Sequence, residues 1–158
     1  MDADTLRKNV WEEMLYASMR SNYFAELVRH YLGVDRGLRV GVLVATSGTV
    51  ATALSDSGAA KIVVPIVAAV ASFWLLISQY GSMARDAADL HEGWGAIADD
   101  YEALWISLAD SADAETRFRQ IYKRAEGLSK SGTKFPNKTR RLEHWLEHAS
   151  TMAKARYA

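Results

Sequence analysis

The segment His144-Trp145-Leu146-Glu147-His148 is the part of this sequence whose residue types come nearest to a catalytic motif. On a helix, two histidines four residues apart lie on one face and can bind zinc, and the glutamate between them can act as a base. A catalytic zinc site needs a third ligand, yet no histidine, cysteine or acidic residue follows His148. We therefore interpret the segment as a surface helix in which Trp145 and Leu146 pack and the histidines lie at the edge.

Other catalytic patterns are weaker still. His91 precedes Glu92 directly, and adjacent residues of a helix do not face each other, so the two form no catalytic dyad. The sequence contains no G-x-S-x-G motif, no glycine-rich phosphate loop and no cysteine. We predict a protein that is not an enzyme and that needs no cofactor or metal.

Length and charge limit what else the chain can be. Its 158 residues allow one domain, or one membrane hairpin with modest extensions. Nineteen basic residues balance nineteen acidic ones, so no overall field attracts nucleic acid, and we expect no direct nucleic-acid partner. Any electrostatic partner must meet a local patch.

Two neighbouring stretches, 40–55 and 62–84, carry no charged residue. The second has 23 residues, about 34 Å as a helix, which is enough to cross a hydrocarbon core of about 30 Å. The first has 16 residues, about 24 Å, and is rich in hydroxyl side chains, so it needs a partner helix. Together they predict a transmembrane helical hairpin in contact with membrane lipid.

Small residues recur along the first stretch at spacings of four, three and four, which places them on one helix face and allows close helix approach in lipid. The neighbouring hydroxyl groups could bond across helices, line a pore, or simply bond to nearby backbone carbonyls. The candidates for span packing or pore lining are Gly41, Ala45, Thr46, Ser47, Gly48, Thr49 and Thr52.

Basic residues predict the orientation of the hairpin. Only Lys61 lies in its turn, whereas the terminal sides carry Arg20, Arg29, Arg36, Arg39 and Arg85. Basic residues favour the cytoplasmic side, so we expect both termini there, in a multi-pass membrane protein. Tyr31 and Tyr80 would then lie near the cytoplasmic interface, which favours amphipathic rings.

Apolar residues alternate at steps of three and four on both sides of the hairpin, which is typical of helices that pair in a coiled stalk. The two seams are Val10, Met14, Ala17, Ser21, Phe24, Val28 and Tyr31, and Ala87, Leu90, Trp94, Ile97, Tyr101, Leu104 and Leu108. Antiparallel pairing outward from the membrane sets Ser21 against Ile97 and Phe24 against Trp94. We expect the second helix to continue from the second span without a break, with a bend or a close contact at Gly93 and Gly95.

Two further helices follow, one capped by Asp113 and one by Asn137. Their apolar faces are Ala114, Phe118, Ile121, Ala125 and Leu128, and Leu142, Trp145, Leu146, Ala149 and Met152. The predicted fold is therefore all-α. It comprises residues 1–110, with the N-terminal helix, the hairpin and the post-membrane helix, and residues 111–158, a C-terminal cytoplasmic helical hairpin.

Charge is uneven after the hairpin. Residues 85–129 carry five basic and ten acidic side chains, whereas residues 130–158 carry seven basic and two acidic ones. This basic patch comprises Lys130, Lys134, Lys138, Arg140 and Arg141. It could contact anionic lipid, or an acidic helix such as the one with Asp99, Asp100 and Glu102, or only solvent.

The layout of N-terminal helix, two-span hairpin and helical extension resembles the SLATT domain family of prokaryotic two-transmembrane effectors. The local likeness lies in the post-membrane run AADLHEGWGAIADDYEALW, residues 87–105, and the resemblance covers roughly Val10 to Leu128. It implies an effector of antiviral (anti-phage) defence that forms a homo-oligomer in the inner membrane and permeabilises it. The trigger is commonly a nucleotide second messenger detected by a partner sensor. No sensor domain is recognisable in this sequence, so the trigger would come from a separate protein or act on the C-terminal helices.

Three alternatives remain open. The chain could be a non-conducting membrane anchor or scaffold whose cytoplasmic helices recruit a soluble partner. It could be a phage lysis protein of the holin type, although the extensions are long for that class. A wholly soluble helical bundle would bury the first stretch as a core helix.

Overall fold

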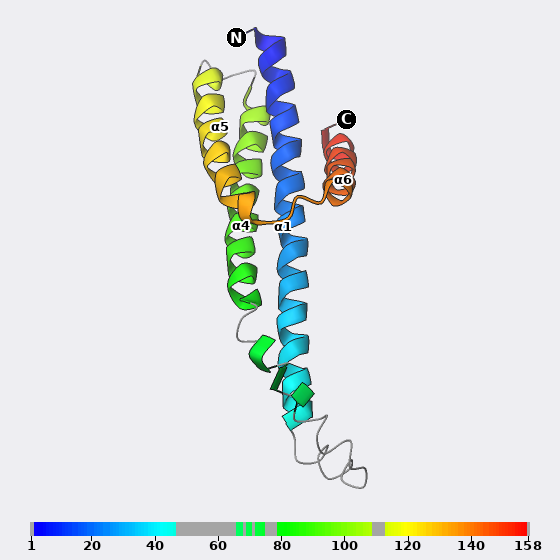
Figure 1. Ribbon diagram of the computed structural model, residues 1–158. Coiled ribbons are helices and arrows are strands. Elements are labelled where there is room, and N and C mark those ends of the chain that lie inside the picture. The colour runs from blue at the N-terminus through cyan, green and yellow to red at the C-terminus, as the bar shows by residue number, and fades with distance from the viewer. Residues whose placement is uncertain are drawn as a thin grey trace. The chain divides into compact units, whose positions relative to one another are not determined.

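The computed structural model describes residues 2–46, 66–67, 69–70, 72–74, 79–108 and 113–157, and every element in this part of the chain is helical (Figure 1). The long helices are α1 (Ala3–Thr46) and α4 (Tyr80–Ile106), and the shorter ones are α5 (Ala114–Ser131) and α6 (Thr139–Tyr157). The 3-10 turn η1 (Gly132–Lys134) directly follows α5. The all-α class expected from the sequence is confirmed.

The chain forms two compact units. The first, here the helical unit, comprises Met1–Glu26 and Asp86–Ala158, and the second, here the apolar unit, comprises Leu27–Arg85. Both α1 and α4 contribute to each unit. The boundary predicted between residues 110 and 111 lies outside the described residues.

In the helical unit, the N-terminal part of α1 and the C-terminal part of α4 run antiparallel. Trp11 contacts Trp105, and ten residues later Ser21 contacts His91. Helix α5 packs on α4, where an added Cβ at Gly93 would lie 2.9 Å from Leu128 Cδ1. Helix α6 contacts α1 through a hydrogen bond from Trp145 to Glu26 (Figure 1).

The core of the helical unit consists of apolar and aromatic side chains at helical spacing. The largest fully buried ones belong to α1 and α4, and include Val10, Phe24, Trp94, Ile97, Tyr101 and Leu104. Helix α5 buries Ala114, Ile121 and Ala125. Helix α6 buries only Ala149, and Leu146 and Met152 of its predicted apolar face are 42% and 61% exposed.

Helix ends differ in detail from the sequence expectations. Helix α5 begins directly after Asp113, as expected, but the Asp113 side chain makes no capping hydrogen bond. Helix α6 begins at Thr139, so Lys138 rather than Asn137 precedes it, and the Lys138 carbonyl accepts hydrogen bonds from the amides of Arg141 and Leu142.

Helix α4 begins at Tyr80, so the helix expected to run without a break from the second apolar stretch into the seam is interrupted. Gln79, just before α4, has a φ of 45°, in the left-handed region that non-glycine residues seldom occupy. Its carbonyl accepts hydrogen bonds from the amides of Ser82 and Met83, both at 3.0 Å. The helical hydrogen-bond pattern of α4 therefore starts at the Gln79 carbonyl.

Among the described residues, no helix combines the length and the apolar character needed to cross a membrane. Most of the predicted hairpin, residues 47–65 and 75–78, lies outside the described residues. At 66–67, 69–70 and 72–74 the backbone is helical.

Candidate functional site

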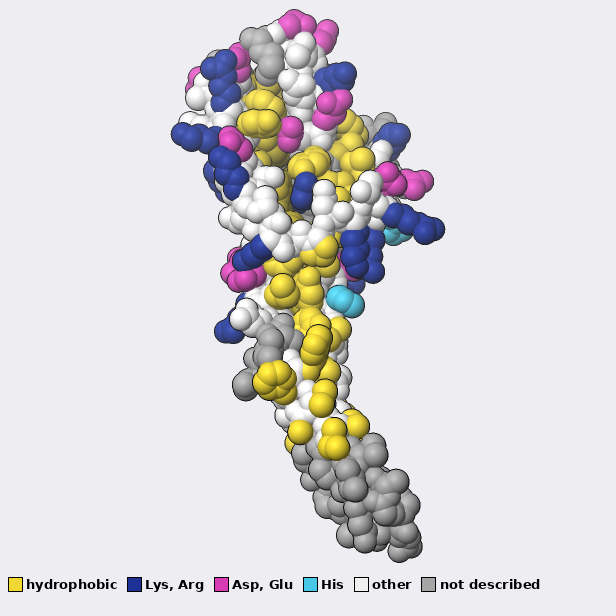
Figure 2. Space-filling view, in the orientation of Figure 1, with side chains coloured by type: hydrophobic (Ala, Val, Ile, Leu, Met, Phe, Trp, Pro, Cys, Tyr) yellow, Lys and Arg dark blue, Asp and Glu magenta, His cyan; other side chains and the backbone are white. Residues whose placement is uncertain are grey.

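Exposed apolar side chains are the main feature of the apolar unit. At the end of α1, Val40, Leu43 and Val44 are 53%, 68% and 55% exposed. The described residues of the second stretch continue this surface, with Ile66, Val67, Val70, Phe73 and Trp74 all between 55% and 65% exposed. Figure 2 shows apolar side chains along this part of the chain on the face in view. We call this surface the apolar segment.

Such an exposed series is unfavourable in water. Burying one large aliphatic or aromatic side chain contributes about 1.5 to 3 kcal/mol, and contiguous exposed apolar surface marks a site of contact with protein or membrane. The apolar segment therefore needs a covering phase that the single chain does not supply among its described residues.

Tyr31 and Tyr80 connect the two ends of the apolar unit. Their rings stack with centroids 6.3 Å apart and an interplanar angle of 28°. The chain thus passes Tyr31 along α1 and returns to the same place at Tyr80, where α4 starts. The two tyrosines expected at one membrane interface lie together.

The predicted small-residue face is described only at its first position. A Cβ added at Gly41 would meet no described atom within 4 Å, so no described helix packs closely there. The backbone of Ala45 and Thr46 closes α1. Ser47, Gly48, Thr49 and Thr52 lie outside the described residues, and their role in packing or pore lining stays a prediction.

The residues expected in the stalk are mostly buried. These are Phe24, Tyr31, Leu90, Trp94, Ile97, Tyr101 and Leu104, whereas Val28 is half-buried. The sequence pattern missed Tyr23 and Leu27, each only 2% exposed, which lie beside the proposed seam. Helix α1 therefore buries a wider face than a strict coiled-coil seam, because α6 and the segment around Pro136 also cover it, the latter through a hydrogen bond from the Tyr23 hydroxyl.

The expected register between α1 and α4 is wrong. The Ser21 hydroxyl donates to the His91 carbonyl at 3.1 Å, and His91 Nδ1 donates to the Ser21 carbonyl at 3.0 Å. A Cβ at Gly95 would lie 3.5 Å from Ser21 Oγ. Ser21 therefore lies against residues two and six positions before Ile97. The reciprocal hydrogen bonds stabilise a register that the apolar pattern alone did not contain.

The two glycines of α4 mark close helix contacts. Gly93 faces Leu128 of α5 and Gly95 faces Ser21 of α1, and both lie inside the continuous helix Tyr80–Ile106. Of the two possibilities considered from the sequence, a bend or a close contact, the structure shows close contacts, one to α5 and one to α1.

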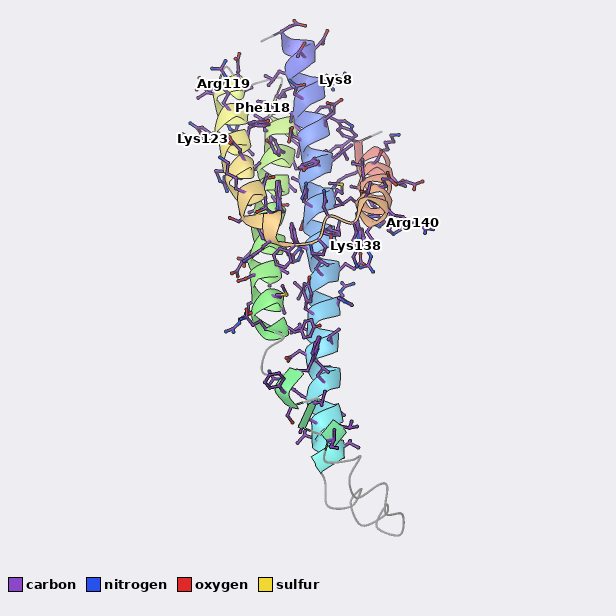
Figure 3. All side chains as sticks on the ribbon, in the orientation of Figure 1. Lys8, Phe118, Arg119, Lys123, Lys138 and Arg140 are labelled. Atoms are coloured by element: carbon purple, nitrogen blue, oxygen red, sulfur yellow. The ribbon has the colours of Figure 1, made fainter. Side chains whose placement is uncertain are left out.

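The basic patch divides in two. Lys130 pairs with Glu126 at 2.8 Å, and this cation holds the pKa of the Glu126 carboxyl below its usual range. Lys134 pairs with Asp86 at 2.6 Å and Arg141 with Glu26 at 2.7 Å. Lys138 and Arg140 are exposed (Figure 3) and form no ion pair with any described residue.

The acidic helix considered as a partner for this patch is occupied by other cations. Arg124 pairs with Asp100 at 2.5 Å, and Arg156 pairs with Glu102 at 2.6 Å. The patch therefore attaches its neighbouring segments to α1 and α4 at other carboxylates, and leaves two cations at the start of α6.

The histidine motif of α6 surrounds a tryptophan. The rings of His144 and His148 lie beside Trp145, with centroids 5.4 and 5.6 Å from it. No group of three metal-ligating side chains occurs within the described part of the chain. Trp145 Nε1 donates to Glu26 Oε2 at 2.9 Å, and Glu26 Oε1 pairs with Arg141. Glu26 thus binds two residues of α6, a role that no sequence pattern indicated.

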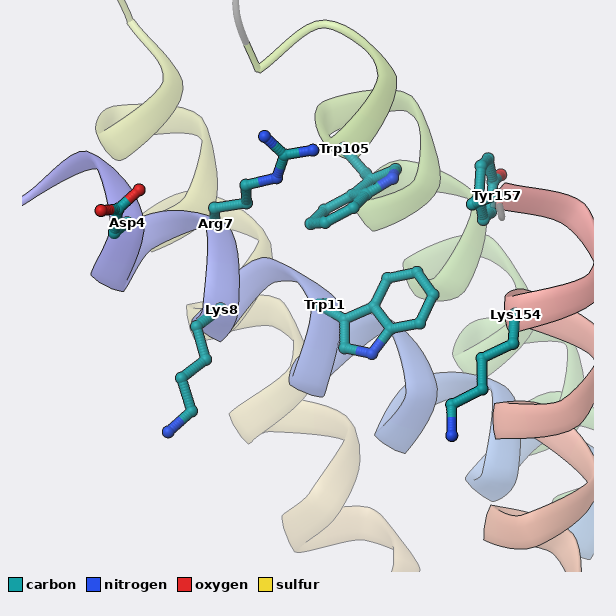
Figure 4. A pocket seen from close by; sticks show the side chains of 7 residues that line it. All are labelled: Asp4, Arg7, Lys8, Trp11, Trp105, Lys154 and Tyr157. Carbon is teal, nitrogen blue, oxygen red and sulfur yellow. The ribbon is translucent and has the colours of Figure 1, made fainter.

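A cavity of about 450 Å³ lies where three helices of the helical unit meet (Figure 4). Its aromatic wall is formed by Trp11 of α1, Trp105 of α4 and Tyr157 of α6, and all three are half-buried. Trp11 lies 5.0 Å from Trp105 and 6.2 Å from Tyr157, centroid to centroid. We call this the Trp11 cavity. The sequence analysis missed it because Trp11 and Trp105 each lie one position from a seam residue.

Comparison of this chain with protein-family models, with curated proteins and with solved structures found no match.

Proposed function

We propose that this chain is an oligomeric effector of the bacterial inner membrane that permeabilises or depolarises the membrane in anti-phage defence when a partner protein triggers it. The observation that carries the proposal is the apolar segment, whose residues belong to the two charge-free stretches of the sequence and expose large side chains. A lipid bilayer is the covering phase that fits charge-free runs of this length.

The stacking of Tyr31 on Tyr80 supports the hairpin of this proposal. Residues between these tyrosines would cross the bilayer and return, with Arg36 and Arg39 near the cytoplasmic headgroups. One two-span hairpin cannot enclose a pore, because two helices leave no lumen. Conduction therefore requires several copies, with the hydroxyl-rich first stretch inward.

The helical unit suits a trigger-receiving role. It presents the open Trp11 cavity, and the cations Lys138 and Arg140, which pair with no carboxylate in the described part of the chain. The same features support the alternative that the chain is a non-conducting anchor that recruits a partner protein.

Induced expression in bacteria separates these functions. We expect wild-type chain, with its neighbouring genes present, to collapse the membrane potential reported by a potential-sensitive dye. Val70→Lys places a charge in the second stretch and should abolish this effect. Ile106→Lys is the matched control, because Ile106 is a similarly exposed aliphatic residue of the helical unit, and it should depolarise like wild type.

A membrane-bound chain that leaves the potential unchanged under these conditions would favour the anchor. Rapid cell lysis instead of depolarisation would favour a holin.

A further inference from the structure

We infer that the Trp11 cavity binds a free nucleotide, with the base stacked on indole and the phosphates held by basic side chains. The inference stands on the helical unit alone and does not depend on the proposed membrane function. Cavities of about 300 to 1,000 Å³ are typical of small-molecule sites, and this one has about 450 Å³.

The first argument is the uncompensated positive charge of the cavity. Arg7, Lys8 and Lys154 line it, together with the single carboxylate of Asp4. Lys8 has one distant partner, Glu12 at 3.8 Å, whereas Arg7 and Lys154 form no ion pair with any described residue.

Elsewhere in the helical unit, some basic side chains, such as Lys138 and Arg140, form no ion pair with any described residue, whereas others are paired closely. Six of them lie within 2.8 Å of a carboxylate: Arg119, Arg124, Lys130, Lys134, Arg141 and Arg156. What distinguishes the cavity is that three basic residues gather around it with only one long ion pair between them and the described carboxylates. This favours an anionic ligand.

The second argument is the aromatic wall. Trp11, Trp105 and Tyr157 come from three different helices, so the wall exists only in the folded unit. The Arg7 guanidinium already lies 5.0 Å from the Trp105 ring centroid. The half-buried Trp11 ring lies between Lys8 and Lys154 in Figure 4. A planar base on this ring would place its attached phosphates within reach of both ammonium groups.

The combination selects one ligand class. A simple anion would not need three aromatic rings, and an uncharged aromatic compound would not need three cations. The Asp4 carboxylate accepts hydrogen bonds and suits the hydroxyl groups of a ribose. Base, sugar and phosphate together describe a nucleotide.

Titration calorimetry of the purified full chain in detergent micelles tests the inference, with adenosine diphosphate as the probe. Adenosine lacks the phosphates and pyrophosphate lacks the base, and we expect each to bind at least tenfold more weakly than adenosine diphosphate. Trp11→Leu and the double variant Lys8→Met/Lys154→Met should each weaken the probe at least tenfold, and Trp11→Phe should restore most of the affinity. Circular dichroism of each variant checks that the helices form.

The control is Lys138→Met/Arg140→Met, which removes the same amount of charge from exposed residues outside the cavity and should leave the affinity within twofold of wild type. An equal loss of affinity in this control variant would mean that net charge alone attracts adenosine diphosphate, and it would overturn the inference. Equal binding of adenosine or of pyrophosphate, binding of a single-stranded decanucleotide only, or no heat from the probe at millimolar concentration would each overturn the inference.

Discussion

Two polar atoms in the core of the helical unit are buried without a hydrogen-bond partner among the described residues. They are the indole nitrogen of Trp94 and the hydroxyl oxygen of Tyr101. A buried polar group without a partner costs about 1 to 3 kcal/mol. Burial also raises the pKa of the Tyr101 hydroxyl, and the nearby Glu13 and Tyr122 raise it further.

Tyr101→Phe should therefore remove the free-energy cost of burying the unpartnered hydroxyl. It should also remove the dependence of stability on pH that this hydroxyl causes. A folded-state pKa above the unfolded value of about 10 means that the folded chain keeps a proton that the unfolded chain loses. The raised pKa of Tyr101 therefore makes its full contribution to the free energy of unfolding below pH 10. Above pH 10 the contribution falls by up to about 1.4 kcal/mol per pH unit.

Urea denaturation at pH 8, 10 and 11 measures this effect. We expect Tyr101→Phe to be at least as stable as wild type at pH 8 and to lose less stability by pH 11. Tyr122→Phe, at a half-exposed residue of α5, removes only the smallest of the three causes of the raised Tyr101 pKa and should keep most of the steeper decline of wild type. Identical slopes for wild type and Tyr101→Phe would contradict the assignment.

The two glycines of α4 allow a second comparison at the residue level. Alanine in a helix interior is favoured over glycine by about 1 kcal/mol. At position 95 the new Cβ makes an ordinary contact with Ser21 Oγ at 3.5 Å, so Gly95→Ala should keep this gain and raise the melting temperature by about 2 to 4 °C. At position 93 the Cβ would lie 2.9 Å from Leu128 Cδ1, so repacking should offset the gain. Thermal unfolding followed by circular dichroism would reject this assignment if Gly93→Ala stabilised as much as Gly95→Ala.

At the level of elements, α6 depends on few contacts. It buries one residue, Ala149. Its first half is bound to α1 by the two bonds of Glu26 to Trp145 and Arg141, and its C-terminal end is bound to α4 by Arg156 and Tyr157, which both contact Glu102. A helix with so little buried surface is held mainly by its polar contacts.

Glu26→Ala should loosen the first half of α6 while leaving α1, α4 and α5 packed and the C-terminal end of α6 bound to Glu102. Loss of both bonds costs about 1 to 2 kcal/mol, because they are partly exposed, and amide exchange within the first half of α6 should become about 5 to 30 times faster. Glu143→Ala is the matched control, since it removes an exposed carboxylate of α6 itself. Hydrogen exchange measured by mass spectrometry gives the comparison. Unchanged exchange in Glu26→Ala would mean that α6 is held by other contacts.

The sequence predicted the helices better than their contacts. Steps of three and four located the buried faces of α1, α4 and α5, because apolar burial repeats with the helical period. The register between α1 and α4 could not be obtained in this way, because it depends on hydrogen bonds between Ser21 and His91. The start of α4 also escaped prediction, since glutamine carries no signal for the left-handed backbone at position 79.

The two candidate sites also differed in how far the sequence alone could predict them. The apolar stretches were visible in the sequence because lack of charge is a property of composition. The Trp11 cavity was not visible, because it combines residues near 4–11, 105 and 154–157 that only the packing of three helices brings together.

At the level of the whole molecule, the chain combines a charged helical unit with an apolar unit whose described side chains are largely exposed between residues 40 and 74. This contrast is the basis of the proposed membrane location. A lysine near the centre of a spanning helix costs about 2.5 to 3.5 kcal/mol on insertion, whereas a lysine at an exposed helix end in water costs little.

The most direct test is alkaline carbonate extraction of membranes from cells that express wild type, Val70→Lys and Ile106→Lys. Our account expects wild type and Ile106→Lys to stay in the membrane pellet, and Val70→Lys to be retained at least tenfold less. Recovery of wild-type chain in the soluble fraction, or equal retention of the two lysine variants, would contradict it.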